Sequence, residues 1–240
     1  MIKAAIFDID NTLYNYDKSH VYGMEALAAY CRTSFGINRE EMNFYYEKAQ
    51  KIANTRIGTD TAAIHSRMIR FQCMTELLSA PIFPHVQNMY HSYWDTLIAH
   101  AEPSPGALHL FSVLKESHIR IGIGTDMTIT IQYEKLKKLG YAPYIDFIVT
   151  SQETGVEKPH PHFFKICTEK AGCLPGECAF IGDNLKKDVQ GAWDNGLCGI
   201  WYTQEKIPEK DMGFPTIVSF SDYCRLSDFL YLCSRSKETQ

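Results

Sequence analysis

Two acidic residues near the N-terminus have the spacing of a catalytic or metal-binding pair. Asp8 and Asp10 follow residues 2–7, an apolar run with the composition of a buried strand. Side chains two residues apart on an extended chain point the same way, so both carboxylates can project from the strand end. Adjacent carboxylates repel each other, and a hard divalent cation, Mg²⁺ by default, relieves that repulsion. The pair therefore predicts a metal site, although Asp8 as a turn cap beside a solvated Asp10 would fit the same residues.

Three more polar clusters follow apolar runs further along the chain. Their candidate residues are Thr125, Asp126, Lys158, Asp183, Asn184 and Asp188. Open parallel sheets bind ligands at the carboxyl ends of their strands, so all these clusters are expected at one edge of a sheet. A threonine hydroxyl beside free backbone N–H groups suits a phosphate oxygen, a lysine supplies counter-charge, and an aspartate supplies a metal ligand. Taken singly, the same residues could be helix caps or surface charges.

The chain after Pro103 has the alternating pattern of an α/β fold. Apolar runs typical of strands occupy residues 119–124, 145–150, 178–182, 197–202 and 216–220, and helical patterns occupy 128–139, 161–171 and 185–195. Strands that alternate with helices indicate a doubly wound parallel sheet covered on both faces, and the first strand belongs to it by composition.

Residues 15–102 separate the first expected strand from the second. This interval is far longer than an ordinary crossover connection, and its apolar residues recur at helical spacing. We therefore expect an all-helical domain at 15–102, inserted into an α/β catalytic core formed by residues 1–14 and 103–233. The polar tail, 234–240, is expected to be frayed.

Composition and charge exclude several classes of protein. The 240 residues are 45% hydrophobic, enough to bury a core, and the net charge of −4 provides no basic field for nucleic acid. No apolar run approaches the roughly 20 residues needed to span a membrane. The eight cysteines show no CxxC spacing, which favours reduced thiols in a cytoplasmic protein. Whether the chain is a monomer or a homodimer is left open.

The polar clusters together resemble the four motifs of the haloacid dehalogenase (HAD) superfamily. The matching residues are Asp8-x-Asp10-x-Thr12, Thr125, Lys158-Pro159 and Gly182-Asp183-x₄-Asp188. The resemblance implies a Rossmann-like core, with residues 15–102 as a helical cap after the first motif. Asn11 stands where glycine is commoner, and asparagine tolerates the left-handed turn expected there. Asp126 and Asn184 also depart from the commonest residues.

The resemblance also implies a mechanism. Asp8 is expected to attack phosphorus and form an aspartyl-phosphate, while Asp10 acts as general acid and then general base. Mg²⁺ is expected to bind Asp8, the backbone carbonyl of Asp10, and Asp183. The residues expected to bind phosphate are Thr125, Asp126 and Lys158, supported by Thr12, Asn184 and Asp188.

The expected function is a Mg²⁺-dependent phosphatase that hydrolyses a small soluble phosphomonoester of the nucleotide or sugar-phosphate type. A phosphomutase shares every catalytic residue and is the alternative. A dehalogenase is disfavoured, because halide leaves without a proton and needs no acid at Asp10. A non-catalytic binding protein would not need all of these charged groups together.

Substrate specificity is expected to come from residues outside the four motifs. Residues 54–60, which contain Gly58, are expected to form a loop between two helices of the insertion. Arg56 in that loop could contact an anionic part of the substrate, although a solvated position fits it as well. Tyr14 and Tyr16, just after the first motif, could line the same cavity.

Overall fold

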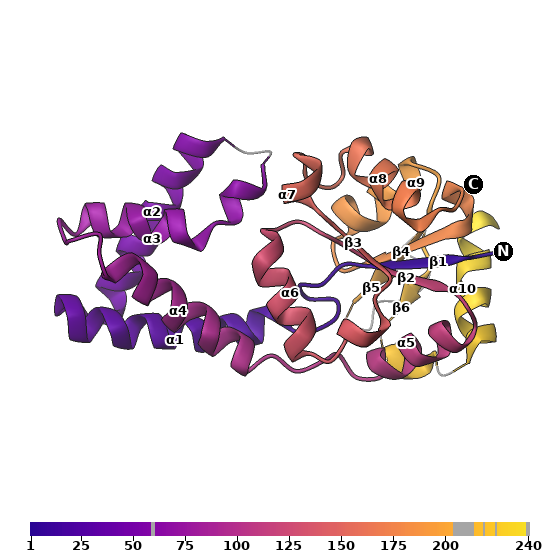
Figure 1. Cartoon of the computed structure of the whole chain (residues 1–240), viewed down its shortest axis with the longest axis horizontal. Coiled ribbons are helices and arrows are strands. Elements are labelled where there is room, and N and C mark those ends of the chain that lie inside the picture. Colours follow the sequence, from indigo (N-terminus) through magenta and orange to yellow (C-terminus); the bar gives the residue numbers. More distant parts are fainter. Residues whose placement is uncertain (59–60, 204–213, 218, 224, 239–240) are drawn as a thin grey trace. The chain divides into compact units, whose positions relative to one another are not determined.

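The computed structural model describes the chain except for residues 59–60, 204–213, 218, 224 and 239–240 (Figure 1). It divides into two compact units, which we call the α/β unit (Met1–Asn15 with Glu102–Gln240) and the helical unit (Tyr16–Ala101). Within the α/β unit, Tyr14 forms an antiparallel bridge with Pro103. The chain therefore leaves and re-enters this unit at neighbouring points, which is how a separate domain can be inserted without disturbing a sheet.

The α/β unit is built on a six-stranded sheet in the order β3-β2-β1-β4-β5-β6. The strands are β1 Ala4–Phe7, β2 Arg120–Thr125, β3 Phe147–Thr150, β4 Cys178–Gly182, β5 Cys198–Tyr202 and β6 Thr216–Ile217. Every pairing is parallel. The predicted doubly wound parallel sheet is confirmed, with the first strand at its centre.

Helices cover both faces of this sheet. Successive side chains of β1 point to opposite sides, and all of them are apolar and buried, so each face needs a covering layer. Ile6 packs into a core cluster with Phe163 and Phe164 on one face. Phe7 faces the other way and meets the Phe111 ring at 4.6 Å between centroids. The helices are α5 Ala107–Glu116, α6 Ile129–Lys138, α7 Ser151–Thr154, α8 Pro161–Ala171, α9 Gly191–Asp194 and α10 Leu226–Glu238.

Several boundaries differ from the sequence-based expectation. The polar tail was expected to be frayed from residue 234, yet α10 continues to Glu238. Helix α5 was not anticipated. The helix expected at 185–195 begins as a π-helix, η4 (Leu185–Gln190), and continues as α9. Beyond Ile217, the last predicted strand becomes a short 3₁₀ turn, η6 (Phe220–Asp222).

The described residues of the helical unit form only helices. They are α1 Tyr16–Phe35, α2 Arg39–Ile57, the 3₁₀ helix η1 Ala62–His65, α3 Arg67–Leu77 and α4 His85–Ala99. Asn38 and Glu41 form a capping box that starts α2. The loop expected at 54–60 was placed too early, because α2 runs to Ile57 and is capped by Gly58 at φ +92°; residues 59–60 lie outside the described part.

None of the described helices combines the length and the apolar character that crossing a membrane requires. The seven cysteines that the structure describes are free thiols. This agrees with the expectation of reduced cysteines, and the cytoplasmic location stays a prediction.

Candidate active site

The first acidic pair lies in a tight turn at the carboxyl end of β1. The Asp8 backbone N–H donates to the Ile181 carbonyl of the neighbouring strand at 2.9 Å, which fixes where the strand ends. Asn11 adopts the left-handed conformation at φ +57°, which asparagine tolerates better than most residues other than glycine. The Leu13 N–H then donates back to Ile9 at 2.9 Å and closes the turn. Asp8 and Asp10 are thereby presented by rigid backbone.

Lys158 is the centre of charge in the site. Its Nζ lies 2.7 Å from Asp8 Oδ1 and 2.7 Å from Asp188 Oδ1, and it donates to the Gly124 carbonyl at 3.2 Å. The residue is only 4% exposed. Burial lowers the pKa of this ammonium, but Asp188 and Asp8 outweigh burial and hold the pKa well above its ordinary value. Lys158 is therefore charged at every physiological pH.

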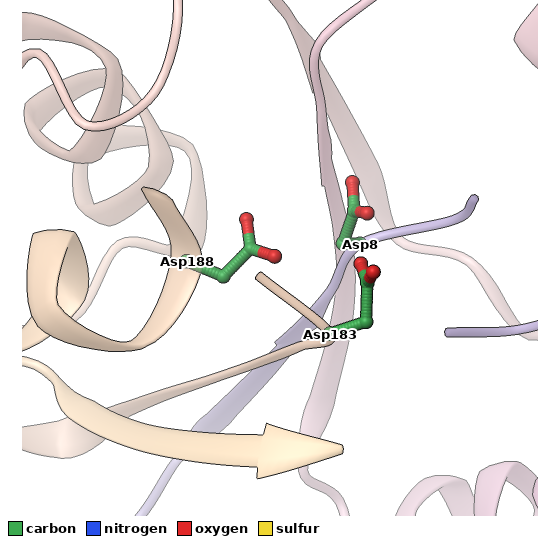
Figure 2. Close-up of side chains that lie close together, drawn as sticks. All are labelled: Asp8, Asp183 and Asp188. Atoms are coloured by element: carbon green, nitrogen blue, oxygen red, sulfur yellow. The ribbon is translucent and has the colours of Figure 1, made fainter. Parts of the chain in front are cut away.

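Three carboxylates converge beside Lys158. Figure 2 shows Asp8, Asp183 and Asp188, each of which offers one oxygen, and these oxygens lie within 4.8 Å of one another. The Asp188 carboxylate occupies the space where a Cβ on Gly182 would lie, so glycine is required at that strand end. The Asp183 backbone is held by Trp201, whose indole Nε1 donates to its carbonyl at 2.7 Å.

The donor set fits a hard divalent cation such as Mg²⁺. Burial, followed by repulsion from Asp188, raises the pKa of Asp183 to about 6. Burial also raises the pKa of Asp8 well above its ordinary value, despite the opposing charge of Lys158. Crowded carboxylates with raised pKa values are the condition that a bound cation relieves. The sequence had assigned Asp188 only a supporting role, and the structure groups it with the other two.

This crowding predicts how the stability of the metal-free protein depends on pH. Asp183 ionises near pH 4 in the unfolded chain and near pH 6 in the folded chain, so the folded state binds more protons between those values. The free energy of unfolding should therefore fall as pH rises through this window. Urea unfolding in chelator should show this fall for the wild type and a flatter profile for Asp183→Asn. An equal dependence of unfolding free energy on pH in both proteins would contradict the raised pKa of Asp183.

Asp10 lies in a different network from Asp8. Its Oδ1 accepts hydrogen bonds from Tyr14 Oη at 2.5 Å and from Lys135 Nζ at 2.6 Å, and Gln132 approaches Oδ2 at 3.5 Å. Burial raises the pKa of Asp10, but Lys135, Tyr14 and Gln132 together hold it below the ordinary value. The two carboxylates thus lie in different environments, Asp8 beside Lys158 and two other carboxylates, and Asp10 among three hydrogen-bond donors.

Sequence reasoning missed Lys135 and Gln132. Both side chains are fully buried on α6, one turn apart at i and i+3. The available signal was a pair of polar residues on the apolar face of a predicted amphipathic helix. Gln132 also donates to Thr125 Oγ1 at 2.6 Å, so it links the second motif to Asp10.

A lysine substitution tests the Asp10 network. Lys135→Met should raise the pKa of Asp10, because the ammonium no longer opposes burial. Breakdown of the expected aspartyl-phosphate needs an ionised Asp10 to take a proton from water, so kcat at neutral pH should fall by about 10-fold to 100-fold. Alkyl phosphates and nitrophenyl phosphate should lose activity alike, because this step is common to both. The measurements are kcat on both substrates and carboxyl ¹³C chemical shifts against pH. Lys138→Met, on the exposed face of α6, is the matched control; an unchanged kcat in Lys135→Met would contradict the role.

The remaining motif residues have structural contacts. The Asp126 carboxylate accepts from the Lys158 backbone N–H at 2.9 Å and pairs with Lys187 at 3.1 Å, so its predicted contact with phosphate would have to use its backbone. Asn184 Oδ1 accepts from the backbone N–H groups that begin η4. Thr12 Oγ1 is buried without a hydrogen-bond partner among the described residues and remains available to support the site.

The three predicted specificity residues have partners within their own units. Tyr14 is bound to Asp10. The Tyr16 hydroxyl accepts from Arg67 at 2.9 Å inside the helical unit. Arg56 is an exposed residue at the end of α2 and pairs with Glu76 at 2.9 Å. Their contact with a substrate stays a prediction.

The fold and the site together define a hydrolase whose acidic residues lie at the strand ends of a parallel α/β sheet. Residues 2–195 match the family model described as haloacid dehalogenase-like hydrolase, and the chain belongs to that family. The ribulose-1,5-bisphosphate 5-phosphatase of Halopiger xanaduensis is 31% identical over 199 residues, which cover 82% of this chain and 83% of the relative. The glyceraldehyde 3-phosphate phosphatase of Methanopyrus kandleri is 30% identical over 213 residues, covering 88% of each chain. These relatives place the chain among the phosphatases of the family.

Solved structures share the fold over almost the whole chain. A HAD phosphatase from Thermococcus onnurineus has a TM-score of 0.71 at 22% identity, covering 95% of this chain and 98% of its own. The HAD-hydrolase YfnB of Bacillus subtilis, bound to magnesium, has a TM-score of 0.67 at 19% identity, with 97% and 99% coverage. A β-phosphoglucomutase from Clostridium difficile has a TM-score of 0.62 at 19% identity, with 99% and 98% coverage. At these identities the likeness shows the fold alone.

Proposed function

We propose that this protein is a Mg²⁺-dependent phosphatase that hydrolyses a small phosphorylated sugar or a related metabolite through an aspartyl-phosphate on Asp8. The observation that carries the proposal is that Asp8 and Asp10, only two residues apart, have different charged partners. Asp8 is bound to Lys158 beside Asp183 and Asp188, while Asp10 is bound to Lys135. The substrates named for the phosphatase relatives, ribulose bisphosphate and glyceraldehyde 3-phosphate, support a small phosphorylated carbohydrate.

In the first step, a carboxylate oxygen of Asp8 attacks phosphorus and the bond to the ester oxygen breaks. Asp10 donates a proton to the leaving alkoxide, so the alcohol departs neutral. Lys158, charged and 2.7 Å from Asp8 Oδ1, balances negative charge that accumulates around the phosphoryl group. In this proposal the hydroxyl of Thr125, at the end of β2, donates a hydrogen bond to a phosphoryl oxygen. Gln132 orients that hydroxyl by donating to its oxygen.

In the second step, water attacks phosphorus and the bond to Asp8 breaks. Asp10, now ionised, takes the proton from the water, and inorganic phosphate leaves. Lys135 favours the ionised form of Asp10 and so assists this step.

The metal-binding residues in this proposal are Asp8 and Asp183 through their carboxylates and Asp10 through its backbone carbonyl. When bound, Mg²⁺ neutralises carboxylate and phosphate oxygens together. Asp188 belongs to the same carboxylate group and is paired with Lys158, so it positions the lysine and supports the metal site.

The helical unit is proposed to serve as the cap that selects the substrate. Support comes from its place in the chain, directly after the first motif, and from the bridge between Tyr14 and Pro103 at its insertion point. Domains inserted in this way commonly close during turnover to exclude bulk water.

Phosphate release from a panel of sugar phosphates, nucleoside monophosphates and triose phosphates tests the function. The protein should release phosphate with Mg²⁺ and lose that activity in chelator, and Asp8→Asn should be inactive throughout. Hexose 1-phosphate belongs in the panel, because conversion into hexose 6-phosphate without release of phosphate would favour the phosphomutase alternative. Full activity in excess chelator would contradict the metal requirement.

A further inference from the structure

The helical unit contains a second cluster of buried charge, remote in sequence from the four motifs. Arg67 and Arg70 lie one turn apart on α3, and both line a cavity of about 290 Å³. They are only 9% and 5% exposed. Tyr46, Gln50 and Asn54 of α2 line the same cavity, so it lies wholly within this unit.

The two guanidinium groups have no anionic partner among the described residues. Arg70 donates to the Tyr46 hydroxyl at 2.7 Å and Arg67 to the Tyr16 hydroxyl at 2.9 Å, so both acceptors are hydroxyl groups and not carboxylates. The Nε atoms of both arginines are buried with no hydrogen-bond partner in the described structure. A buried unpaired charge is costly, and an orphaned buried donor adds to that cost.

Neighbouring aromatic rings reduce the cost of burying the two guanidinium groups but do not neutralise their charge. The Arg70 guanidinium lies 5.0 Å from the centroid of the Tyr46 ring, and Arg67 lies 5.5 Å from that of Tyr93. Such contacts attract a desolvated cation but supply no negative charge. The positive field also acts on His20, whose pKa is lowered to about 4, first by burial and then by Arg67. Among the described residues, the cavity is lined by uncompensated positive charge.

We propose that the cavity lined by Arg67 and Arg70 binds a phosphate group. Two guanidinium groups side by side offer planar pairs of donors and two positive charges, which match the charge of a phosphate monoester at neutral pH. The amides of Gln50 and Asn54 add hydrogen-bonding groups on the opposite helix. The volume leaves room for carbon atoms that carry the phosphate.

The phosphate can come from two sources with the same chemistry. It is either a second phosphate of the substrate, in which case the inference rests on the proposed function, or free inorganic phosphate that regulates the protein. The experiment below separates these sources and has a readout that does not depend on turnover.

Direct binding is measured on the full chain by NMR of the arginine Nε–H groups, assigned with Arg67→Lys and Arg70→Lys. Titration with inorganic phosphate in metal-free buffer should shift both signals along one saturable curve. The signals lie in the cavity itself, so they respond there even if the protein hydrolyses no phosphate ester. No saturable shift of either signal, or shifts with acetate and none with phosphate, would overturn the proposal.

A variant that adds a charge avoids the risk that removing an arginine unfolds the unit. Asn54→Asp should weaken phosphate binding about tenfold or more, because a carboxylate in the cavity competes for the arginines. The same change should raise the melting temperature without phosphate, since it neutralises buried charge. Asn43→Asp, on the same helix but outside the cavity, should do neither. Unchanged phosphate affinity in Asn54→Asp would overturn the proposal.

Kinetics then identify the source of the phosphate. If it belongs to the substrate, Asn54→Asp should raise KM about tenfold for a sugar bisphosphate and leave KM unchanged for the corresponding monophosphate. If it is free phosphate, Asn54→Asp should leave both KM values unchanged. Any change in rate that added inorganic phosphate causes in the wild type should then be lost in this variant. Both results support the site, whereas a failure of all esters to react in the wild type would contradict only the proposed function.

Discussion

Asp8→Asn should reduce turnover of every phosphate ester by about 10⁴-fold or more, because the amide removes the nucleophile while preserving the shape of the side chain. Binding of substrate should change much less, since Lys158 can still donate to the amide oxygen at this position. The measurement is steady-state hydrolysis with Mg²⁺, joined to intact-mass spectrometry of acid-quenched protein. The wild type should carry a phosphoryl group during turnover, and the variant should carry none.

Asp10→Asn is the matched comparison, since it makes the same chemical change two residues away. It should slow hydrolysis of alkyl phosphates by about 10²-fold or more, and it should spare phosphorylation of Asp8 by nitrophenyl phosphate, which has an activated leaving group. Phosphorylated protein should therefore accumulate in this variant. Wild-type turnover in Asp8→Asn would rule out the covalent route.

Lys158→Met should lower both activity and stability. The variant leaves Asp8 and Asp188 buried without their shared cation, and breaking a buried ion pair in this way costs about 3–5 kcal/mol of unfolding free energy. The pKa of Asp8 should rise further, because burial is no longer opposed by the ammonium. Turnover should fall by about 10²-fold to 10³-fold through the lost contact with the transferring phosphoryl group.

The size of the stability loss should depend on pH in a way that can be checked. Because the pKa of Asp8 is raised, this carboxylate can take up a proton at pH 4, so the variant should lose less stability than at pH 7. Lys165→Met is the control, because this lysine pairs with Glu169 on the surface of α8, where the two side chains are 68% and 54% exposed and ion pairs contribute little. Equal destabilisation by the two substitutions at pH 7 would contradict the central position of Lys158.

The sequence by itself was sufficient to determine the sheet and the grouping of the four motifs. Strand composition and the alternation with helices predict a parallel sheet, and the carboxyl ends of parallel strands meet at one edge. Asp8 and Asp183 each follow a strand and Thr125 ends one, so their proximity follows from topology. Local rules also sufficed for the turn after β1, where Asn11 takes the left-handed conformation.

Only the tertiary structure decided which polar groups surround each carboxylate. Lys135 contacts Asp10 from 125 residues away, through a rotation of α6 that its periodicity does not specify. Asp188 reaches Lys158 because Gly182 leaves space for its carboxylate. The buried arginines of α3 likewise read as ordinary helix-surface residues until packing against α2 encloses them. Short-range patterns specify elements and their ends, whereas contacts between side chains on different elements depend on how those elements pack.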